Sequence, residues 1–291
     1  MKIAFAALTD VGLVRQNNED SFLVLDLASR KRYVPAPPSC EGSAEPREEG
    51  LLLAVADGMG GALAGEVASR MAVEALALAA AAISAETGDE ECRSTLMKGI
   101  GSANLAIFDQ AQANPQQRGM GTTLTAAYLH RGRVGFFQVG DSKGYRYVRL
   151  EGRLHQMTKA HSLIDTLVDD GVISTEDAEQ LQGGKNIILR AIGAEAEVKV
   201  DYTEGAVAEG DVVLLASDGL HGCVKAKEIE EIVRLAVDPG KLCEDLVRAA
   251  RAHGAPDNVT VIAVSVLDVE GEAAEPQGIL GRIGALFKRG K

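Results

Sequence analysis

The sequence predicts a globular protein of the α+β class, and three features of its pattern carry this expectation. Short apolar runs that end in aspartate and glycine are typical of buried strands, and residues 51–61, LLLAVADGMGG, are the clearest of them. Two longer stretches with helical character, 63–83 and 92–113, follow this run. From 122 to 150 the pattern changes to strands joined by tight turns, which indicates an antiparallel meander.

The other elements are expected from the same signals. Strands are predicted at 3–8, 21–27, 51–56, 122–129, 134–139, 145–150, 211–216 and 259–267, with an extended run at 187–192. Helices are predicted at 63–83, 92–113, 161–170, 175–182, 227–236 and 241–253. Residues 29–49 lose periodicity and collect prolines and glutamates, so we expect a disordered segment or a hairpin insertion on the surface.

Composition and charge narrow the functional classes. The 291 residues carry a formal net charge of −12, and 46% of them are hydrophobic, which suffices for a sizeable core. An acidic balance argues against nucleic acid, whose phosphates are held by clustered Lys and Arg. The four cysteines show no CxxC pairing, so we expect reduced thiols in the cytoplasm. No window approaches a membrane span, and 1–8 is too short for a signal peptide.

The C-terminal end differs from the rest of the chain. Residues 268–291 begin as an acidic linker and end in a short basic segment, 279–291, whose apolar residues share one helical face. A helix this short is marginal on its own. We expect disorder here in preference to docking on a partner or a membrane surface. The chain therefore divides into a domain at 1–267 and a tail at 268–291.

Carboxylates recur where the predicted strands begin or end. They are, in chain order, Glu19, Asp20, Asp57, Asp141, Asp218 and Asp257. Each aspartate alone is typical of a turn. Gathered in one place they would repel one another unless cations neutralised them, and hard oxygen ligands suit Mg²⁺ or Mn²⁺. Two such ions can clamp a phosphoryl group, and Arg15 would then hold phosphate oxygens, unless it is an ordinary surface arginine.

Other ligand chemistries fit the sequence less well. The five histidines are dispersed and none has HxxxH spacing, which argues against zinc. Residues 60–65 have the GxxxxG spacing of a P-loop, but Glu66 and Val67 follow where Lys and Ser or Thr are required. A nucleotide-dependent kinase or dehydrogenase is therefore not expected.

Taken in order, the motifs resemble the type 2C (PPM) family of metal-dependent serine/threonine protein phosphatases in its compact bacterial form. The matching segments are TDVGLVRQNNEDS at 9–21, VADGMGG at 55–61, GMGTTLTAAYL at 119–129, VGDSKGYRY at 139–147, TKAHSLI at 158–164, ILRAIG at 188–193, LASDGL at 215–220 and PDNVTVIAV at 256–264. They span about residues 3–267, and their number and order argue against chance.

The resemblance implies a four-layer αββα sandwich of two antiparallel sheets flanked by helices, with a metal cleft between the sheets. It implies two core ions, Mn²⁺ or Mg²⁺, and a third, weaker one. Asp57 would bridge the core ions, and Asp141 would reach the third together with Asp218. The residues that it assigns to the ions are Glu19, Asp20, Asp57, Gly58, Asp141, Asp218 and Asp257.

The implied activity is hydrolysis of phosphoserine and phosphothreonine on proteins by attack of a metal-bridged water. Arg15, Asp57 and Asp218 would be catalytic, and Arg15, His161 and Ser162 would bind the substrate. The implied partners are proteins phosphorylated by a serine/threonine kinase, and the kinase itself.

Three positions depart from the family pattern. Met59 stands where eukaryotic members carry a histidine proposed as general acid, although bacterial members share the methionine, so a metal-bound water would protonate the leaving group. Lys143 replaces the usual arginine after GDS, which looks tolerable. The predicted helices at 161–170 and 175–182 are open to two interpretations, a mobile flap over a site or an ordinary surface helical hairpin. Ala160 replaces an aspartate common in the TKDHS version, which affects the contacts of such a flap or binding of the weak ion.

Two alternatives remain open from the sequence. One is a catalytically dead module of the same fold that binds phosphoproteins, which the complete carboxylate set argues against. The other is a two-metal phosphodiesterase or nuclease, which keeps the chemistry but lacks a basic groove.

Overall fold

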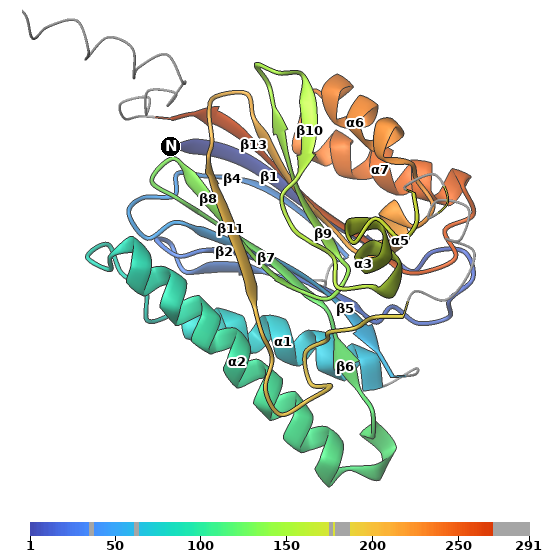
Figure 1. The fold of residues 1–291 in the computed structure, drawn as a ribbon. Coiled ribbons are helices and arrows are strands. Elements are labelled where there is room, and N and C mark those ends of the chain that lie inside the picture. Colours follow the sequence, from blue (N-terminus) through green and yellow to red (C-terminus); the bar gives the residue numbers. More distant parts are fainter. Residues whose placement is uncertain (35–37, 61–63, 175–176, 178–186, 270–291) are drawn as a thin grey trace, which may run out of the picture.

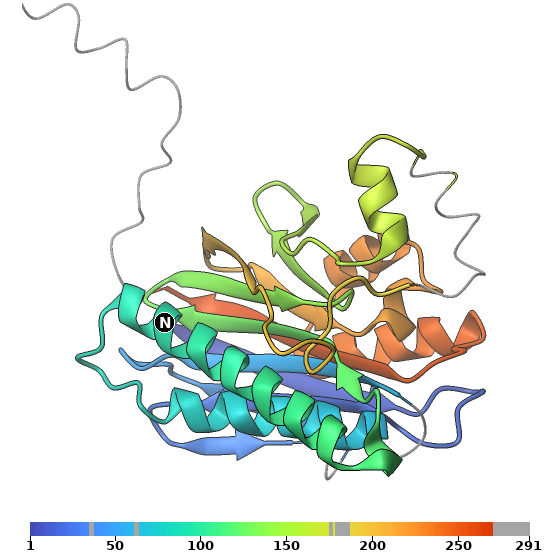
Figure 2. The ribbon, with the colours of Figure 1, turned by 60° about the horizontal axis from the view of Figure 1, so that its bottom comes forward.

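The computed structural model describes residues 1–34, 38–60, 64–174, 177 and 187–269. Their strands form two antiparallel sheets (Figures 1 and 2). The first sheet contains, in order across it, β10 (Arg153–Gln156), β9 (Lys143–Val148), β12 (Val212–Ala216), β13 (Val259–Asp268), β1 (Lys2–Asp10) and β4 (Ser39–Ala44). The second contains β11 (Asp201–Ala206), β8 (Arg133–Val139), β7 (Leu124–His130), β5 (Leu51–Met59), β2 (Asp20–Asp26) and β3 (Lys31–Tyr33), and β6 (Gly121–Thr122) pairs with β5.

Helices cover the outer face of each sheet. The long helices α1 (Ala64–Ala80) and α2 (Asp89–Ala113) pack on the second sheet. The short α5 (Asp218–His221), with α6 (Ala226–Leu235) and α7 (Pro239–Ala252), packs on the first. The chain also forms η1 (Pro115–Gln117) and α3 (Leu163–Asp169). These are the four layers of the predicted αββα sandwich, and that prediction is confirmed.

The opening apolar run shows how sequence produces the layers. In β5, Leu51, Leu53 and Val55 face the core between the two sheets. The alternate residues Leu52 and Ala54 face the core beneath α1 and α2. A strand covered on both faces reads as a continuous apolar run, because neither set of side chains meets water. The run therefore marks a central strand.

Two expectations for the chain's connections were wrong. The expectation of a disordered segment or surface hairpin at 29–49 does not hold for 31–33 and 39–44, since β3 pairs with β2 in one sheet and β4 pairs with β1 in the other. In β4 the ladder to β1 provides the stability, and Gly42 leaves room for the ring of Phe5, which a Cβ there would approach to 2.7 Å. Small and polar residues pair in this way without any apolar period.

The three-stranded meander is the second error. The strands β7 and β8 form a hairpin as expected, but β9 lies beside β12 in the opposite sheet. The chain crosses between the sheets at Gly140-Asp141-Ser142, so this turn lies where the two sheets meet. The elements β10, β11 and α5 were not predicted, and residues 187–192 form isolated bridges instead of a strand.

Other expected elements agree with the structure to within a few residues. The ion pair of Arg70 with Glu66 forms on α1, with Nη1 3.5 Å from Oε1. Most of the predicted helix 175–182 and the whole amphipathic segment 279–291 lie outside the described residues, so these remain predictions. No helix among the described residues is long and apolar enough to cross a membrane.

Candidate metal centre

Two carboxylates lie opposite each other in the second sheet. Asp20 is the first residue of β2, and the antiparallel ladder pairs it directly with Asp57 near the end of β5. Side chains of directly paired residues lie on one face, about 4.5–5.5 Å apart at Cβ, and like charges there destabilise the pair. The fold therefore holds two acidic groups at close range.

The first sheet supplies further carboxylates from its strand ends. Asp218 follows β12 at the start of α5, Asp257 lies just before β13, and Asp141 lies in the crossing turn before β9. Burial raises the pKa of Asp57 well above its usual value, and the charges of Asp20, Asp218, Asp141 and Asp257 raise it further. Asp57 and Asp218 are thus close enough for their charges to interact. Both sheets thus contribute to a single acidic cluster.

Several oxygens of this cluster are buried without a partner. Among the described residues, Oδ1 of Asp20, both carboxylate oxygens of Asp141 and Oδ1 of Asp218 accept no hydrogen bond. Burial raises the pKa of Asp20 and Asp141 to about 7 and that of Asp218 to about 6. Buried polar atoms without partners are costly unless something satisfies them. Hard divalent cations with oxygen ligands, Mn²⁺ or Mg²⁺, fit this donor set.

One arginine faces the cluster. The guanidinium Nη2 of Arg15 lies 2.5 Å from Oδ2 of Asp257, while about half of the Arg15 side chain is exposed. This hydrogen bond raises the pKa of Arg15. No three His, Cys, Asp or Glu side chains of the described residues already adopt the spacing of a metal site. Arg15 thus neutralises part of the negative charge of the cluster at Asp257.

The two remaining predicted ligands lie at the edge of the cluster. The Gly58 amide donates to the carbonyl of Glu19 at 3.2 Å. A Cβ on Gly58 would lie 2.2 Å from the Gly65 carbonyl oxygen, so only glycine permits this approach. Burial and the charge of Asp257 raise the pKa of Glu19, and Arg15 opposes them. The structure thus brings Glu19 and Gly58 to the acidic cluster.

Neighbouring polar residues fix the backbone of the cluster. The Asp57 carbonyl accepts from the Thr123 amide at 2.8 Å and from Thr122 Oγ1 at 2.9 Å, and the Asp57 amide donates to Thr123 Oγ1 at 3.0 Å. Asn258 accepts from the Glu19 amide at 2.8 Å. Ser217 Oγ donates to Oδ2 of Asp20 at 2.8 Å. No role was predicted for Thr122, Thr123, Ser217 or Asn258, although each lies inside a quoted motif.

The structure places His161 and Ser162 beside the crossing turn. His161 is buried, and its Nδ1 accepts from the Gly140 amide at 3.1 Å. Ser162 caps α3, because its Oγ accepts from the Asp165 amide at 3.0 Å. Their role in substrate binding remains a prediction.

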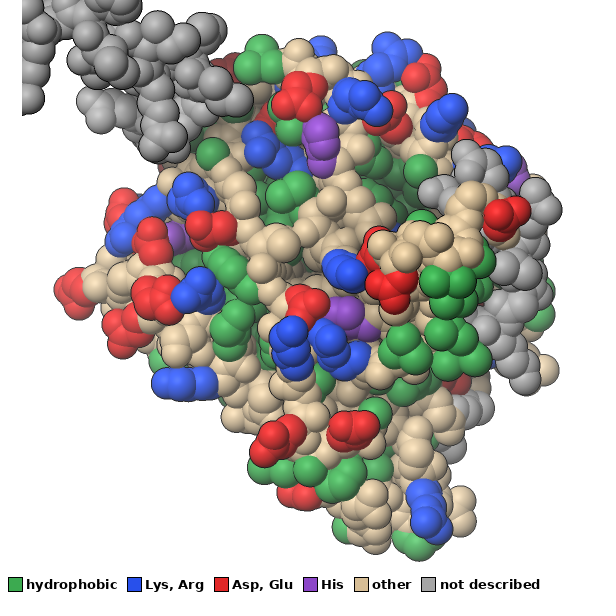
Figure 3. Space-filling model, in the orientation of Figure 1, with side chains coloured by type: hydrophobic (Ala, Val, Ile, Leu, Met, Phe, Trp, Pro, Cys, Tyr) green, Lys and Arg blue, Asp and Glu red, His purple; other side chains and the backbone are tan. Residues whose placement is uncertain are grey.

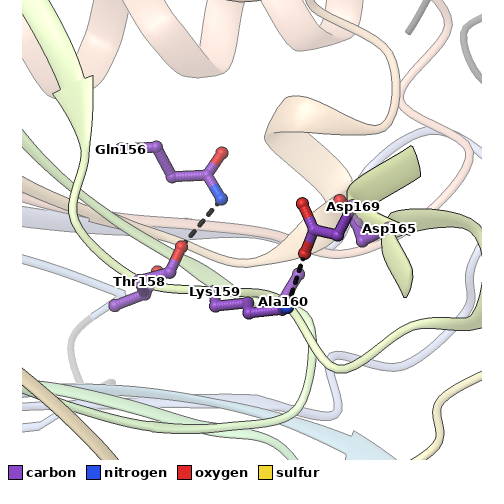
Figure 4. Close-up of a pocket in the computed structure, with 6 residues that line it drawn as sticks. All are labelled: Gln156, Thr158, Lys159, Ala160, Asp165 and Asp169. Atoms are coloured by element: carbon purple, nitrogen blue, oxygen red, sulfur yellow. Dashed lines mark hydrogen bonds and ion pairs between the residues drawn. The ribbon is translucent and has the colours of Figure 1, made fainter. Parts of the chain in front are cut away.

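The structure shows the contacts of Lys143, Ala160 and Met59, the three positions that depart from the family pattern. Lys143 Nζ lies 3.5 Å from Oδ1 of Asp165. Ala160 lines a cavity of about 480 Å³ together with Gln156, Thr158, Lys159, Asp165 and Asp169. Figure 4 shows these residues. Across it, Lys159 Nζ contacts Oδ2 of Asp169 at 2.8 Å. Met59 packs against Gly121, where a Cβ would lie 2.9 Å from the Met59 Cε. A thioether cannot donate a proton, so Met59 has no acid role.

A cluster of buried and half-buried carboxylates from two sheets, next to a half-exposed arginine, is the site of a metal-dependent phosphoryl hydrolase. Residues 42–249 match the sequence model of protein phosphatase 2C. This match covers well over half of the chain, and the protein belongs to the protein phosphatase 2C family. The predicted family, fold and enzyme class are thereby confirmed.

Individual relatives agree with this assignment. The serine/threonine phosphatase Stp of Listeria welshimeri is 36% identical over 256 residues, which cover 88% of this chain and 93% of that protein. The crystal structure of the Mycobacterium tuberculosis phosphatase PstP is 35% identical with a TM-score of 0.76, covering 92% of this chain and all of that one. A PstP catalytic domain in complex with two manganese ions is 36% identical, with a TM-score of 0.74 and the same coverage.

Proposed function

We propose that this protein dephosphorylates phosphoserine and phosphothreonine on proteins and so opposes a serine/threonine kinase, which is itself among its substrates. The observation that carries this proposal is the set of buried, unpartnered carboxylate oxygens beside the half-exposed Arg15. A phosphoryl group brings negative charge, which an acidic cluster accepts only when cations are bound. The relatives named serine/threonine phosphatases support the choice of substrate class.

Asp57 would be a ligand of both Mn²⁺ or Mg²⁺ ions. Gly58 together with Glu19 or Asp20 would complete the site of one ion. Asp218 and Asp257 would serve the other ion. Asp141 would take part in a third site together with Asp218. Bound ions of this kind activate water and stabilise negative charge on a phosphoryl group.

The chain's own residues have separate tasks in this reaction. Arg15 offers a planar fork of N–H donors to phosphate oxygens once Asp257 is engaged elsewhere. The charge of Asp218 raises the pKa of Asp57, so bound cations would relieve the repulsion between these two carboxylates. The Thr122 and Thr123 hydroxyls keep the backbone of Asp57 in place during turnover. Positioning and charge neutralisation, and not a covalent phosphoenzyme, are then the contribution of the protein.

Other parts of the prediction remain proposals. We propose that 1–267 is the catalytic domain and 268–291 a tail. A cytoplasmic location is supported by four free cysteines, of which Cys92 and Cys243 are buried. On the face drawn in Figure 3, acidic and basic side chains alternate, which favours protein substrates over nucleic acid.

The test is hydrolysis of a phosphothreonine peptide with added Mn²⁺ by the wild-type chain and by Asp57→Asn. Asp109→Asn, the same exchange at an exposed position of α2, is the matched control and should retain full activity. Full activity in a chelator or in Asp57→Asn would refute the proposal. Peptide binding without turnover across a Mn²⁺ titration would instead indicate a phosphoprotein-binding module. Nuclease activity that Asp57→Asn removes would indicate the phosphodiesterase alternative.

A further inference from the structure

Among the described residues, no side chain or backbone group hydrogen-bonds to the carboxylate of Asp141. Asp141 is only 2% exposed, yet neither of its side-chain oxygens has a hydrogen-bond partner among the described residues. Its position is therefore set by the turn at 140–142, where the chain crosses from one sheet to the other. Whatever fixes this turn also fixes the carboxylate.

His161 hydrogen-bonds to both polar backbone groups of Gly140 in the turn. The Gly140 amide donates to Nδ1 of His161 at 3.1 Å, and the His161 amide donates to the Gly140 carbonyl at 2.8 Å. Gln138 Nε2 also donates to that carbonyl, at 2.9 Å. Gly140 has a φ of +102°, and a Cβ there would lie 2.6 Å from Thr123 Cβ, so other residues cannot adopt this turn.

The contact with Gly140 decides the tautomer of His161. Because Nδ1 accepts a hydrogen bond, the proton of the neutral imidazole is on Nε2. Nε2 then donates to Oδ2 of Asp201, the first residue of β11, at 3.0 Å. Arg190 Nη1 donates to the other carboxylate oxygen, Oδ1, at 3.0 Å. It also lies 2.9 Å from Nε2, but a protonated Nε2 cannot accept from it.

The charge states agree with this arrangement. Burial lowers the pKa of His161, which keeps the imidazole neutral. Burial alone would raise the pKa of Asp201, but the hydrogen bond from His161 and the charge of Arg190 outweigh it and keep the carboxylate ionised. A chain of hydrogen bonds therefore leads from the Arg190 guanidinium through the Asp201 carboxylate and the neutral His161 imidazole to the Gly140 amide.

We propose that Arg190, Asp201 and His161 are positioning residues that hold Gly140 and thereby place the Asp141 carboxylate for a weakly bound third cation. This inference rests on the proposed function, because it takes Asp141 as a metal ligand. None of the three needs to touch substrate. Arg190 lies in the motif at 188–193 and Asp201 is the first residue of β11. The sequence motifs gave neither residue a role, and the structure joins both to the crossing turn.

Two substitutions of His161 separate its two contacts. The Oδ1 of Asn in His161→Asn lies where Nδ1 lies and keeps an acceptor for the Gly140 amide. The Nε2 of Gln in His161→Gln reaches Asp201 but leaves the Gly140 amide without its acceptor. His155→Gln, at an exposed histidine of β10, is the matched control.

The first measurement is the Mn²⁺ concentration that gives half-maximal hydrolysis of a phosphothreonine peptide. Loss of a residue that orients a metal ligand typically costs about 10–100-fold in metal affinity or activity. We expect His161→Gln to raise the half-saturating Mn²⁺ concentration by about this factor, with a smaller change in KM for the peptide. His161→Asn and Asp201→Ala should fall between it and wild type, and His155→Gln should match wild type.

The second measurement is amide hydrogen exchange of the segment around Gly140 in the metal-free protein. Exchange should be faster in His161→Gln than in His161→Asn. The proposal would be overturned if both His161 variants had the same Mn²⁺ dependence and the same exchange rates. It would also be overturned if both lost the same activity in proportion to a lowered Tm. If wild type hydrolyses no phosphopeptide at any Mn²⁺ concentration, the proposed function fails, while the exchange comparison still decides whether His161 holds Gly140.

Discussion

Replacing Asp218 by asparagine should stabilise the metal-free protein while removing its response to Mn²⁺. Asp218 is half-buried beside Asp57 and Asp257, with its Oδ1 fully enclosed, and desolvation with the charge of Asp257 raises its pKa to about 6 from 3.8. At roughly 1.36 kcal/mol per pKa unit, ionising this group at pH 8 costs the folded state about 3 kcal/mol. Asp218→Asn removes that cost, keeps nearly the same shape and leaves a donor for Asp57. For a domain of this size the gain corresponds to an increase of about 6–12 °C in Tm.

The assay is thermal unfolding at pH 8 in a chelator and again in excess Mn²⁺. In the chelator Asp218→Asn should unfold at the higher temperature. In Mn²⁺ the order should reverse, because ligand binding stabilises only a folded state that still has its site. Asp109→Asn, at an exposed position, should follow wild type in both conditions. An Asp218→Asn protein that folds but melts at or below wild type in the chelator would refute the electrostatic reasoning.

Three further predictions follow from the same structure. Between about pH 4 and pH 7 the metal-free protein should lose stability as pH rises, because Asp20 and Asp141, with pKa values of about 7 against 3.8, keep protons that the unfolded chain has lost. The measurement is Tm in a chelator across this pH range, and a Tm that rises with pH would contradict the prediction. Asp211→Ala should cost about 3–5 kcal/mol in urea unfolding, since it leaves Arg146, now 2.7 Å from Asp211, unpaired; a loss under about 1 kcal/mol would contradict the reasoning. Asn104→Ala should cost about 1–3 kcal/mol, because it leaves the buried Gly193 amide without its acceptor at 2.7 Å; unchanged urea unfolding would count against this.

The central elements of the fold were predictable because their side chains carry the signal. The run at 51–56 is apolar on both faces of β5, and α6 and α7 alternate buried and exposed residues with helical spacing. The edge strand β4 carries no such signal. Its residues are small or polar, and the ladder to β1 determines its conformation. Residues 153–156 and 201–206 form β10 and β11 at sheet edges for the same reason.

The sequence alone determined the chemistry of the site, because carboxylate side chains at strand ends and their order along the chain are written in it. Asp57, Asp218 and Asp257 were expected together and lie together. Tertiary structure decided what depends on distant contacts. It pairs Arg15 with Asp257, and it places β9 in the opposite sheet from β8. It also turns His161 toward Gly140 and Asp201, residues 21 and 40 positions away in the chain. Such contacts follow from how two sheets meet, which no local pattern of residues records.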